Sequence, residues 1–332
     1  MEEIITLDYG SGGKKTSALI EEMILPLLDN EILKELDDGA LLPGNEQLVF
    51  STDSFVVSPY FFSGGDIGKL AVCGTVNDVA VSGGEPKYLS LSLILEEGLP
   101  VEDLRKIIAS IKKTSEEAGV KIVTGDTKVV ERGKGDGIYI NTSGIGFLRK
   151  KMSKKDLREG DVLLVSGPVG NHGTAVMLGR NENLVFGDIR SDCAPLHEIC
   201  RRLYELEDDL VFLRDPTRGG IATTLNEFVE GSELTVELEE KDIPVEASVS
   251  SACDILGIDP YYCACEGRVL VAVRKEAAEK ALEILHSCRG AEGAAVIGTV
   301  TKRSPGRVLL KTGFGGSRIL NKLSGAQLPR IC

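Results

Sequence analysis

The 332-residue chain contains no tryptophan and only three histidines, and aromatic residues make up only 5% of it. No CxxC pair is present among its eight cysteines, so neither a disulfide framework nor a zinc-thiolate motif is predicted. No apolar run is long enough to span a bilayer, and the start "MEEIITLDYG" lacks the basic and apolar regions of a secretory signal. We therefore expect a cytoplasmic protein that does not contact a membrane.

Positive charge is also scarce, because the formal net charge at pH 7 is −13. A nucleic-acid-binding protein normally carries a basic patch, and the chain has none of any length, so no nucleic-acid partner is expected. An acidic protein can still bind an anionic nucleotide when a divalent cation lies between its carboxylates and the phosphates.

Helical and extended patterns alternate along the chain, which predicts an α/β or α+β protein in two halves. The segment 101–119 places its apolar residues at helical spacing, with Pro100 before it and Gly119 at its end. Segments 120–127 and 137–147 have the pattern of strands. Helical and strand patterns alternate again after residue 161.

A basic, turn-like stretch at 149–161 predicts the junction between the halves, and the regular patterns end near Phe314. The predicted divisions are an N-terminal loop and helix, an N-terminal domain, a C-terminal domain and a tail, at 1–35, 36–150, 151–313 and 314–332. The tail ends on Cys332. A terminal thiol is accessible and can act as a nucleophile and carrier, although from the tail alone an ordinary frayed end is the commoner explanation.

A glycine-rich stretch, "DYGSGGKKT" at 8–16, precedes a helical pattern. Its residues Gly10, Ser11, Gly12 and Gly13 would let backbone N–H groups approach an anion closely. A flexible turn explains the stretch equally well, and the spacing of a Walker loop is absent from the chain.

Four aspartates in the first 130 residues adjoin apolar runs, namely Asp38, Asp53, Asp78 and Asp126. Any one of them can be explained as a turn or cap residue. Together they favour a site for a hard cation, because buried carboxylates are costly unless they are paired or bound to metal. Oxygen ligands and the scarcity of histidine point to Mg²⁺ rather than zinc.

Two later segments carry further candidate groups. In "LRDPTRGG", Arg214 and Arg218 either face a phosphate or carboxylate or form surface ion pairs. In "CACEGRVLVAV", Glu266 precedes an apolar strand, where partial burial would raise its pKa toward that of a general base. A solvated glutamate is the commoner case at such a position. The close thiols Cys263 and Cys265 are a weak metal signal, and we favour buried structural thiols.

Seven segments, taken in order, resemble the HypE family of hydrogenase maturation factors, which are carbamoyl dehydratases of the AIR-synthase (PurM-like) ATP-binding superfamily. The segments are "GSGG", "GTVNDVAVSGG", "GDTKVV", "INTSGIG", "GPVGNHG", "RDPTRGG" and the terminal "PRIC". The resemblance runs along essentially the whole chain, and "PRIC" separates this family from selenide water dikinases and thiamine-phosphate kinases. It implies a two-domain PurM-like fold, with the N-terminal sheet pairing across a homodimer, helices covering the C-terminal sheet, and a mobile tail.

The resemblance also implies an activity and its partners. The carbamoyltransferase HypF would place a carbamoyl group on Cys332, and ATP with Mg²⁺ would drive its dehydration to a thiocyanate. The CN group would then pass to the HypC–HypD iron scaffold, for the iron centre of a NiFe hydrogenase. The 18 residues from Gly315 to Cys332 extend to roughly 60 Å at about 3.3 Å each, which suits a tail that visits a partner.

The resemblance assigns roles to individual residues. Cys332 would be the acceptor, Glu266 the base that removes the nitrogen protons, and Lys128 a positive charge at the phosphate. Mg²⁺ would be held by the four aspartates named above. The nucleotide would contact Gly10, Ser11, Gly12, Gly13, Asp53, Asn77, Asp78, Gly125 and Asp126.

Two other functions compete with this interpretation. A small-molecule kinase of the same superfamily would turn over ATP on a free substrate without needing Cys332. A non-catalytic carrier would use the terminal thiol only to shuttle a group and would not consume ATP. If Glu266 is not the base, His172, among glycines at a predicted helix start, is the next candidate.

Overall fold

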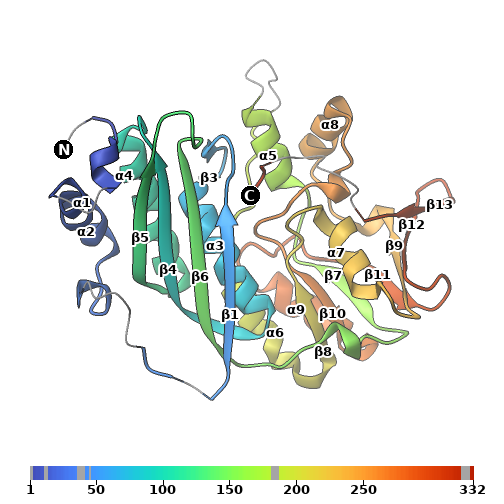
Figure 1. The fold of residues 1–332 in the computed structure, drawn as a ribbon. Helices are drawn as coiled ribbons and strands as arrows, with labels where there is room; N and C mark the ends of the chain where they lie inside the picture. The colour runs from blue at the N-terminus through green and yellow to red at the C-terminus, as the bar shows by residue number, and fades with distance from the viewer. Residues whose placement is uncertain (1–2, 11–13, 36–41, 45, 181–186, 323–329) are drawn as a thin grey trace.

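The computed structural model describes residues 3–10, 14–35, 42–44, 46–180, 187–322 and 330–332. The described residues form two α/β units, each built around its own sheet (Figure 1). The predicted mixed α/β fold in two halves is therefore confirmed. No helix in the described part of the chain has the length and apolar character needed to cross a membrane.

The N-terminal unit contains a four-stranded sheet in the order β1–β6–β4–β5, in which only β4 and β5 are parallel. Its strands are β1 (Leu48–Phe55), β4 (Gly84–Glu96), β5 (Lys121–Val130) and β6 (Ile138–Leu148). A two-stranded ribbon joins β2 (Phe61–Phe62) to β3 (Gly65–Asp66). The helices are α1 (Lys14–Leu19), α2 (Leu25–Leu28), α3 (Ile67–Val81) and α4 (Val101–Ala118).

Helices α3 and α4 cover one face of this sheet. Helix α4 has the predicted bounds: Pro100 is its N-cap, and Gly119 ends it in the left-handed conformation with φ of 65°. Asp66 caps α3 by accepting hydrogen bonds from the N–H groups of Gly68 and Lys69. Helix α3 is buried on nearly all sides, because it also packs against elements of the second unit.

The opposite face of the four-stranded sheet carries exposed apolar side chains. Phe50 is 67% exposed and Leu48 52%, and Ile145 lies opposite Phe50 on β6. Side chains alternate between the two faces along a strand, so the neighbouring residue Ser51 points toward α3. We call this surface the open face of the N-terminal sheet.

The C-terminal unit contains a seven-stranded sheet in the order β13–β12–β9–β11–β7–β10–β8. Its strands are β7 (Val162–Val165), β8 (Leu210–Arg214), β9 (Thr235–Glu239), β10 (Leu270–Val273), β11 (Ala295–Thr301), β12 (Arg307–Lys311) and β13 (Ser317–Leu320). Its helices are α5 (Asn171–Gly179), α6 (His197–Leu203), α7 (Gly220–Val229), α8 (Ala247–Leu256) and α9 (Ala278–His286).

The structure differs from the predicted tail. Residues 317–320 form the edge strand β13, which pairs antiparallel with β12 and buries Leu320. The expected tail from 314 therefore starts too early: glycines around Phe314 make the turn between two strands, which looks irregular in sequence. Residues 330–332 do not extend outward, and the C-terminus lies between the two units (Figure 1).

Candidate active site

The terminal cysteine lies in the junction between the two units, where the backbone following β1 holds it. The N–H of Val56 donates to a carboxylate oxygen of Cys332 at 3.2 Å. The Cys332 thiol lies 3.7 Å from Nη2 of Arg218, which belongs to the C-terminal unit. Burial raises the pKa of this thiol to about 11; the charge of Glu266 adds to the rise and Arg218 opposes it.

Glu266, the predicted base, is a buried carboxyl group. It lies between a short 3-10 turn, Pro260–Tyr262, and strand β10, and it is only 2% exposed. Its Oε1 atom is buried without a hydrogen-bond partner. Burial, followed by the neighbouring Cys193 and Asp215, raises its pKa well above the ordinary value. The solvated alternative is therefore wrong, and Glu266 lies near enough to the Cys332 thiol to add to the rise of its pKa.

The loop that bears Glu266 packs against the "RDPTRGG" loop. The N–H of Cys265 donates to the carbonyl of Pro216 at 3.0 Å. Gly220 has φ of 57°, and a Cβ there would lie 2.5 Å from the carbonyl oxygen of Tyr261, so only glycine permits this approach. This close packing places Arg218 at the tail.

The two arginines of that loop have different environments. Arg214 forms an exposed ion pair with Glu227 at 3.9 Å, which is the surface alternative considered from the sequence. Arg218 instead faces the site, and its contact with the Cys332 sulfur raises the pKa of the guanidinium. One motif therefore supplies one surface residue and one site residue.

Asn77 was expected to contact the nucleotide, but its side chain joins the two units. It is 1% exposed, and its Nδ2 donates to the carbonyl oxygens of Ala194 (3.1 Å) and Glu266 (3.2 Å). Its Oδ1 accepts from the N–H of Leu196 at 2.7 Å. Three hydrogen bonds occupy the amide, because helix α3 directs this residue into the junction, and a contact of Asn77 with the nucleotide stays a prediction.

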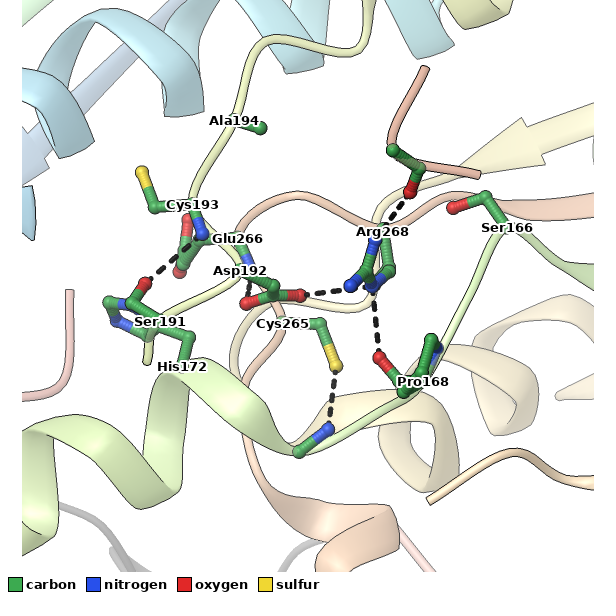
Figure 2. A network of polar contacts seen from close by, with 12 residues as sticks. Ser166, Pro168, His172, Ser191, Asp192, Cys193, Ala194, Cys265, Glu266 and Arg268 are labelled. Carbon is green, nitrogen blue, oxygen red and sulfur yellow. Dashed lines mark hydrogen bonds and ion pairs between the residues drawn. The ribbon is translucent and has the colours of Figure 1, made fainter. Parts of the chain in front are cut away.

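A second buried residue holds the other end of the Glu266 peptide (Figure 2). Oδ1 of Asp192 accepts from the N–H of Glu266 at 3.2 Å, and Oδ2 lies 3.6 Å from Nε of Arg268. Arg268 in turn donates to the carbonyl of Pro168 at 2.9 Å. The main chain of Glu266 is thus held from both units, by Asn77 and by Asp192.

Two of the four predicted metal-binding aspartates lie on the α3 side of the N-terminal sheet. Asp78 accepts a hydrogen bond from the Ser51 hydroxyl at 2.7 Å, and repulsion from Asp78 adds to the burial that raises the pKa of Asp53. Asp215, 4% exposed, faces the same pair, and burial, then Asp78, raises its pKa to about 7. Asp215 was missed in sequence because Asp-Pro was interpreted only as the start of a turn.

Asp126 does not join that pair within one chain. Asp53 pairs across β1 and β6 with Thr142, whose hydroxyl contacts α3, whereas Asp126 pairs with Ser92. Strand alternation therefore places Asp126 on the open face. There it binds Lys128 at 2.7 Å, and this hydrogen bond lowers the pKa of Asp126. The structure thus keeps Lys128 and Asp126 apart from Glu266 within one chain.

The remaining predicted nucleotide and metal residues have mixed outcomes. Gly125 lies inside the sheet, where a Cβ would come 2.4 Å from the carbonyl oxygen of Leu91, so close strand packing is one reason for glycine. Gly10 ends a short 3-10 turn, Leu7–Gly10. Ser11, Gly12, Gly13 and Asp38 lie outside the described residues.

The other cysteines are structural. All seven are buried, as predicted, and the thiols of Cys253 and Cys263 are 4.0 Å apart. Cys265 does not join them; its sulfur accepts from the N–H of Gly170. In the parts of the chain that the structure describes, no group of three or more His, Cys, Asp or Glu side chains is arranged to hold a metal ion.

Comparison with family models matches two adjoining regions of the chain. Residues 36–148 match the AIR synthase related protein, N-terminal domain, and residues 158–311 match the AIR synthase related protein, C-terminal domain. The matches coincide with the two α/β units described above.

The chain is also similar to characterised proteins over nearly its full length. The carbamoyl dehydratase HypE of Azotobacter vinelandii is 46% identical over 334 residues, which cover 99% of this chain and 97% of that protein. A crystal structure of hydrogenase maturation protein HypE in complex with ATP matches with a TM-score of 0.95 and 46% identity, covering 98% of this chain and 99% of that one. A HypE–HypF complex structure matches at 48% identity with a TM-score of 0.80, covering 92% and 100% of the two chains.

Proposed function

Since the chain belongs to the HypE family of carbamoyl dehydratases, within the AIR synthase-related proteins, we propose that it is an ATP-dependent enzyme that dehydrates an S-carbamoyl group on its own Cys332. The product is a thiocyanate, the source of the CN ligand for the iron of a NiFe hydrogenase. One observation carries this proposal: the terminal thiol lies 3.7 Å from Nη2 of Arg218, in a loop that packs directly against the loop of Glu266.

The chemistry explains why a nucleotide is needed. Loss of water from an amide requires a better leaving group than hydroxide. The carbamoyl oxygen takes the γ-phosphoryl group of ATP and ADP leaves. The carbon–oxygen bond then breaks as phosphate departs, the nitrogen loses its two protons, and the carbon–nitrogen bond becomes triple. The oxygen of the carbamoyl group therefore ends in phosphate.

Glu266 is the residue that we assign as the base. Its raised pKa makes the carboxylate a stronger proton acceptor than a solvated glutamate. The partnerless Oε1 is free to accept a proton from the carbamoyl nitrogen. Arg218, beside the sulfur, supplies a fixed positive charge where the phosphorylated oxygen develops negative charge. His172 is less suited to the role, because Nε2 is within hydrogen-bond distance of a backbone carbonyl oxygen.

ATP would lie on the α3 side of the junction, with Mg²⁺ between its phosphates and the aspartates. Asp53 and Asp78 offer hard oxygen ligands there, and Asp215 faces them. Because the described residues hold no cluster of three ligands, phosphate oxygens and water would complete the octahedral set that Mg²⁺ requires. When bound, the ion would neutralise charge that develops on the transferring phosphoryl group.

The tail must leave the site to be carbamoylated. In the docked state burial keeps the Cys332 thiol protonated, and a protonated thiol is a poor nucleophile. Acceptance of the carbamoyl group from HypF therefore belongs to an undocked state. The chain beyond Lys322 reaches up to about 33 Å at roughly 3.3 Å per residue. The resulting CN group would pass to the HypC–HypD complex.

The open face of the N-terminal sheet would form the homodimer contact. Its exposed Phe50 and Leu48 are the apolar residues that such a contact would cover. Asp126 and Lys128 lie on the same face, which would put them at the subunit boundary. Lys128 would then act on phosphates at that boundary rather than beside Glu266 of its own chain.

The experiment that tests this function uses mass spectrometry of Cys332 after carbamoylation by HypF. With Mg-ATP, we expect the modified residue to lose one water as ADP and phosphate appear; without it, the carbamoyl group should persist. A free-substrate kinase would turn over ATP equally well with Cys332→Ala, and a carrier would keep the carbamoyl group intact in the presence of Mg-ATP. Either result would overturn the proposal.

A further inference from the structure

The last three residues lie beside the segment that follows β1 and are held there by two main-chain hydrogen bonds. The N–H of Val56 donates to a carboxylate oxygen of Cys332, and the N–H of Ser58 donates to the carbonyl of Arg330 at 3.3 Å. Contacts to the main chain hold a peptide whatever side chains it carries. We call the residues that hold the last three positions the tail seat: Val56, Ser58, Asp136, His172 and Arg180.

His172 binds the carbonyl of Ile331, the residue between Arg330 and Cys332. Its Nε2 lies 2.9 Å from the oxygen of Ile331, and its Nδ1 lies 2.8 Å from the Ser191 hydroxyl. The carbonyl of Ile331 can only accept, so Nε2 carries the proton, and in the neutral ring Nδ1 accepts from the Ser191 hydroxyl. Burial lowers the pKa of His172, so the ring is neutral and Nε2–H is the donor to Ile331.

Arg180 completes the contacts to the main chain. Its Nη2 donates to the carbonyl of Arg330 at 2.6 Å, and its Nε donates to the carbonyl of Ser58 at 2.6 Å. Arg180 therefore bridges the tail and the segment that follows β1. The carbonyls of Arg330 and Ile331 and the carboxylate of Cys332 are all bound by groups that belong to the folded units.

Side chains add sequence preference to this main-chain binding. The Arg330 guanidinium forms an ion pair with Asp136, donates to the carbonyl of Val56 at 3.0 Å and lies 5.9 Å from the centre of the Tyr139 ring. Ile331 is 5% exposed and packs into the N-terminal core. The tail seat, together with Arg218 at the thiol, thus matches an arginine, a medium-sized apolar residue and a cysteine, in that order.

These contacts all reach residues 330–332 themselves, whatever connects them to the rest of the chain. We propose that the tail seat is a binding site for peptides ending in Arg-Ile-Cys, so that the enzyme also dehydrates an S-carbamoyl cysteine on a separate chain. This rests on the proposed function. The reaction is the same dehydration as on Cys332. ATP phosphorylates the carbamoyl oxygen and becomes ADP, and that oxygen then leaves as part of phosphate. The nitrogen loses two protons, and the peptide cysteine carries the cyano group.

The enzyme's own tail competes for the seat, because a tethered segment has a high effective concentration, on the order of millimolar. A full-length variant with Arg330→Ala and Cys332→Ala weakens that competition and removes the internal acceptor. The probe is the synthetic peptide Leu-Pro-Arg-Ile-Cys, with an S-carbamoyl group and a free carboxylate. It is incubated at millimolar concentration with this variant and Mg-ATP.

We expect the peptide to lose one water in an ATP-dependent manner. A peptide with alanine in place of arginine should react at least about tenfold more slowly, because a charge-assisted pair is lost. Adding Glu266→Gln to the variant should suppress the conversion. If the parent chain dehydrates its own carbamoylated Cys332 while no peptide is converted, the inference fails and the proposed function stands. If the parent fails as well, both are overturned.

Discussion

At the scale of single residues, burial decides which groups can carry the chemistry. Glu266 and Cys332 both have raised pKa values because burial in the junction, nearly complete for Glu266 and partial for Cys332, disfavours their charged forms. The effect is useful for one and inhibitory for the other. A base gains proton affinity, whereas a nucleophilic thiol loses reactivity. The same surroundings therefore favour dehydration and prevent carbamoyl transfer while the tail is docked.

The first prediction at this scale concerns Glu266→Gln, which preserves shape and removes the base. The variant should still accept the carbamoyl group and bind ATP, but form thiocyanate more slowly by roughly 10²–10⁴-fold, as for loss of a positioned general base. The rate is measured by single-turnover mass spectrometry on carbamoylated Cys332. Dehydration at the parent rate would show that Glu266 is only structural.

The second prediction concerns pH. Docking raises the pKa of Cys332 from 9.0 to about 11, so the docked state favours the protonated thiol. The equilibrium constant for docking of the tail should be at its highest below pH 9, and it should fall by up to about a hundredfold as the pH rises to 11 and beyond. The NMR methyl signal of Ile331, buried only when the tail is docked, reports the populations.

Two matched forms control for other titrating groups. Cys332→Ser and S-carbamoylated Cys332 do not ionise in this range, so their docking should stay constant between pH 8 and 10.5. A parent protein whose Ile331 signal is equally constant would contradict the prediction.

At the scale of elements, helix α3 connects the two units. Its face toward the N-terminal sheet carries Thr75, whose hydroxyl lies 2.5 Å from that of Thr142. Its other face carries Asn77, which holds the loops at Ala194 and Glu266. Helix α3 therefore fixes the main chain of Glu266 relative to the N-terminal sheet.

Replacing Asn77 by alanine should lower the free energy of unfolding by about 2–3 kcal/mol, because buried partners lose their hydrogen bonds. It should also slow dehydration, since Glu266 is held less firmly, while ATP affinity is retained. Thr75→Val is the control, because it removes a buried hydrogen bond from the same helix without touching the second unit. Denaturant unfolding, ATP titration and the dehydration rate measure the three effects. Lost ATP affinity in Asn77→Ala alone would restore the original assignment of Asn77 as a nucleotide contact.

At the scale of the whole molecule, the proposed dimer contact on the open face and the proposed ATP site depend on each other. The chain places Asp53 and Asp126 on opposite faces of the same sheet. A homodimer built on the open face would make both of them part of a nucleotide site at the subunit boundary. The two predictions that follow separate the role of the dimer from that of the single chain.

Phe50→Asp should convert the dimer to a monomer at micromolar concentration, because it places charge in the apolar contact. Ile255→Asp is the matched control, since Ile255 is 65% exposed on α8 of the other unit. Sedimentation velocity distinguishes the two forms. A parent protein that already sediments as an active monomer would contradict the proposed dimer.

Asp53→Asn and Asp126→Asn should each weaken Mg-ATP binding by about tenfold or more in the dimer, because each removes a hard anionic ligand without changing size. In the Phe50→Asp monomer, only Asp53→Asn should have a further effect. Calorimetric titration with Mg-ATP measures both. If neither variant differs from the parent, the aspartates are not ligands.

The sequence by itself determined the local structure and the family. Pro100 and Gly119 mark the ends of α4 because capping depends on a few adjacent residues. The terminal "PRIC" and the ordered motifs were enough to indicate the activity and to single out Glu266 and Cys332. Where the local signal was weak, as at Phe314 before β13, the boundary was misplaced, because a two-strand turn and a frayed tail have the same composition.

Only the tertiary structure decided which of these residues meet. Whether an aspartate on a strand faces α3 or the open face depends on strand register, and a shift of one residue reverses it, so Asp53 and Asp126 could not be separated beforehand. Asn77 binds the loop of Glu266, and Arg218 contacts Cys332. Both contacts join residues that lie more than a hundred positions apart in the sequence. Such contacts depend on how whole units pack, which no short stretch of sequence encodes.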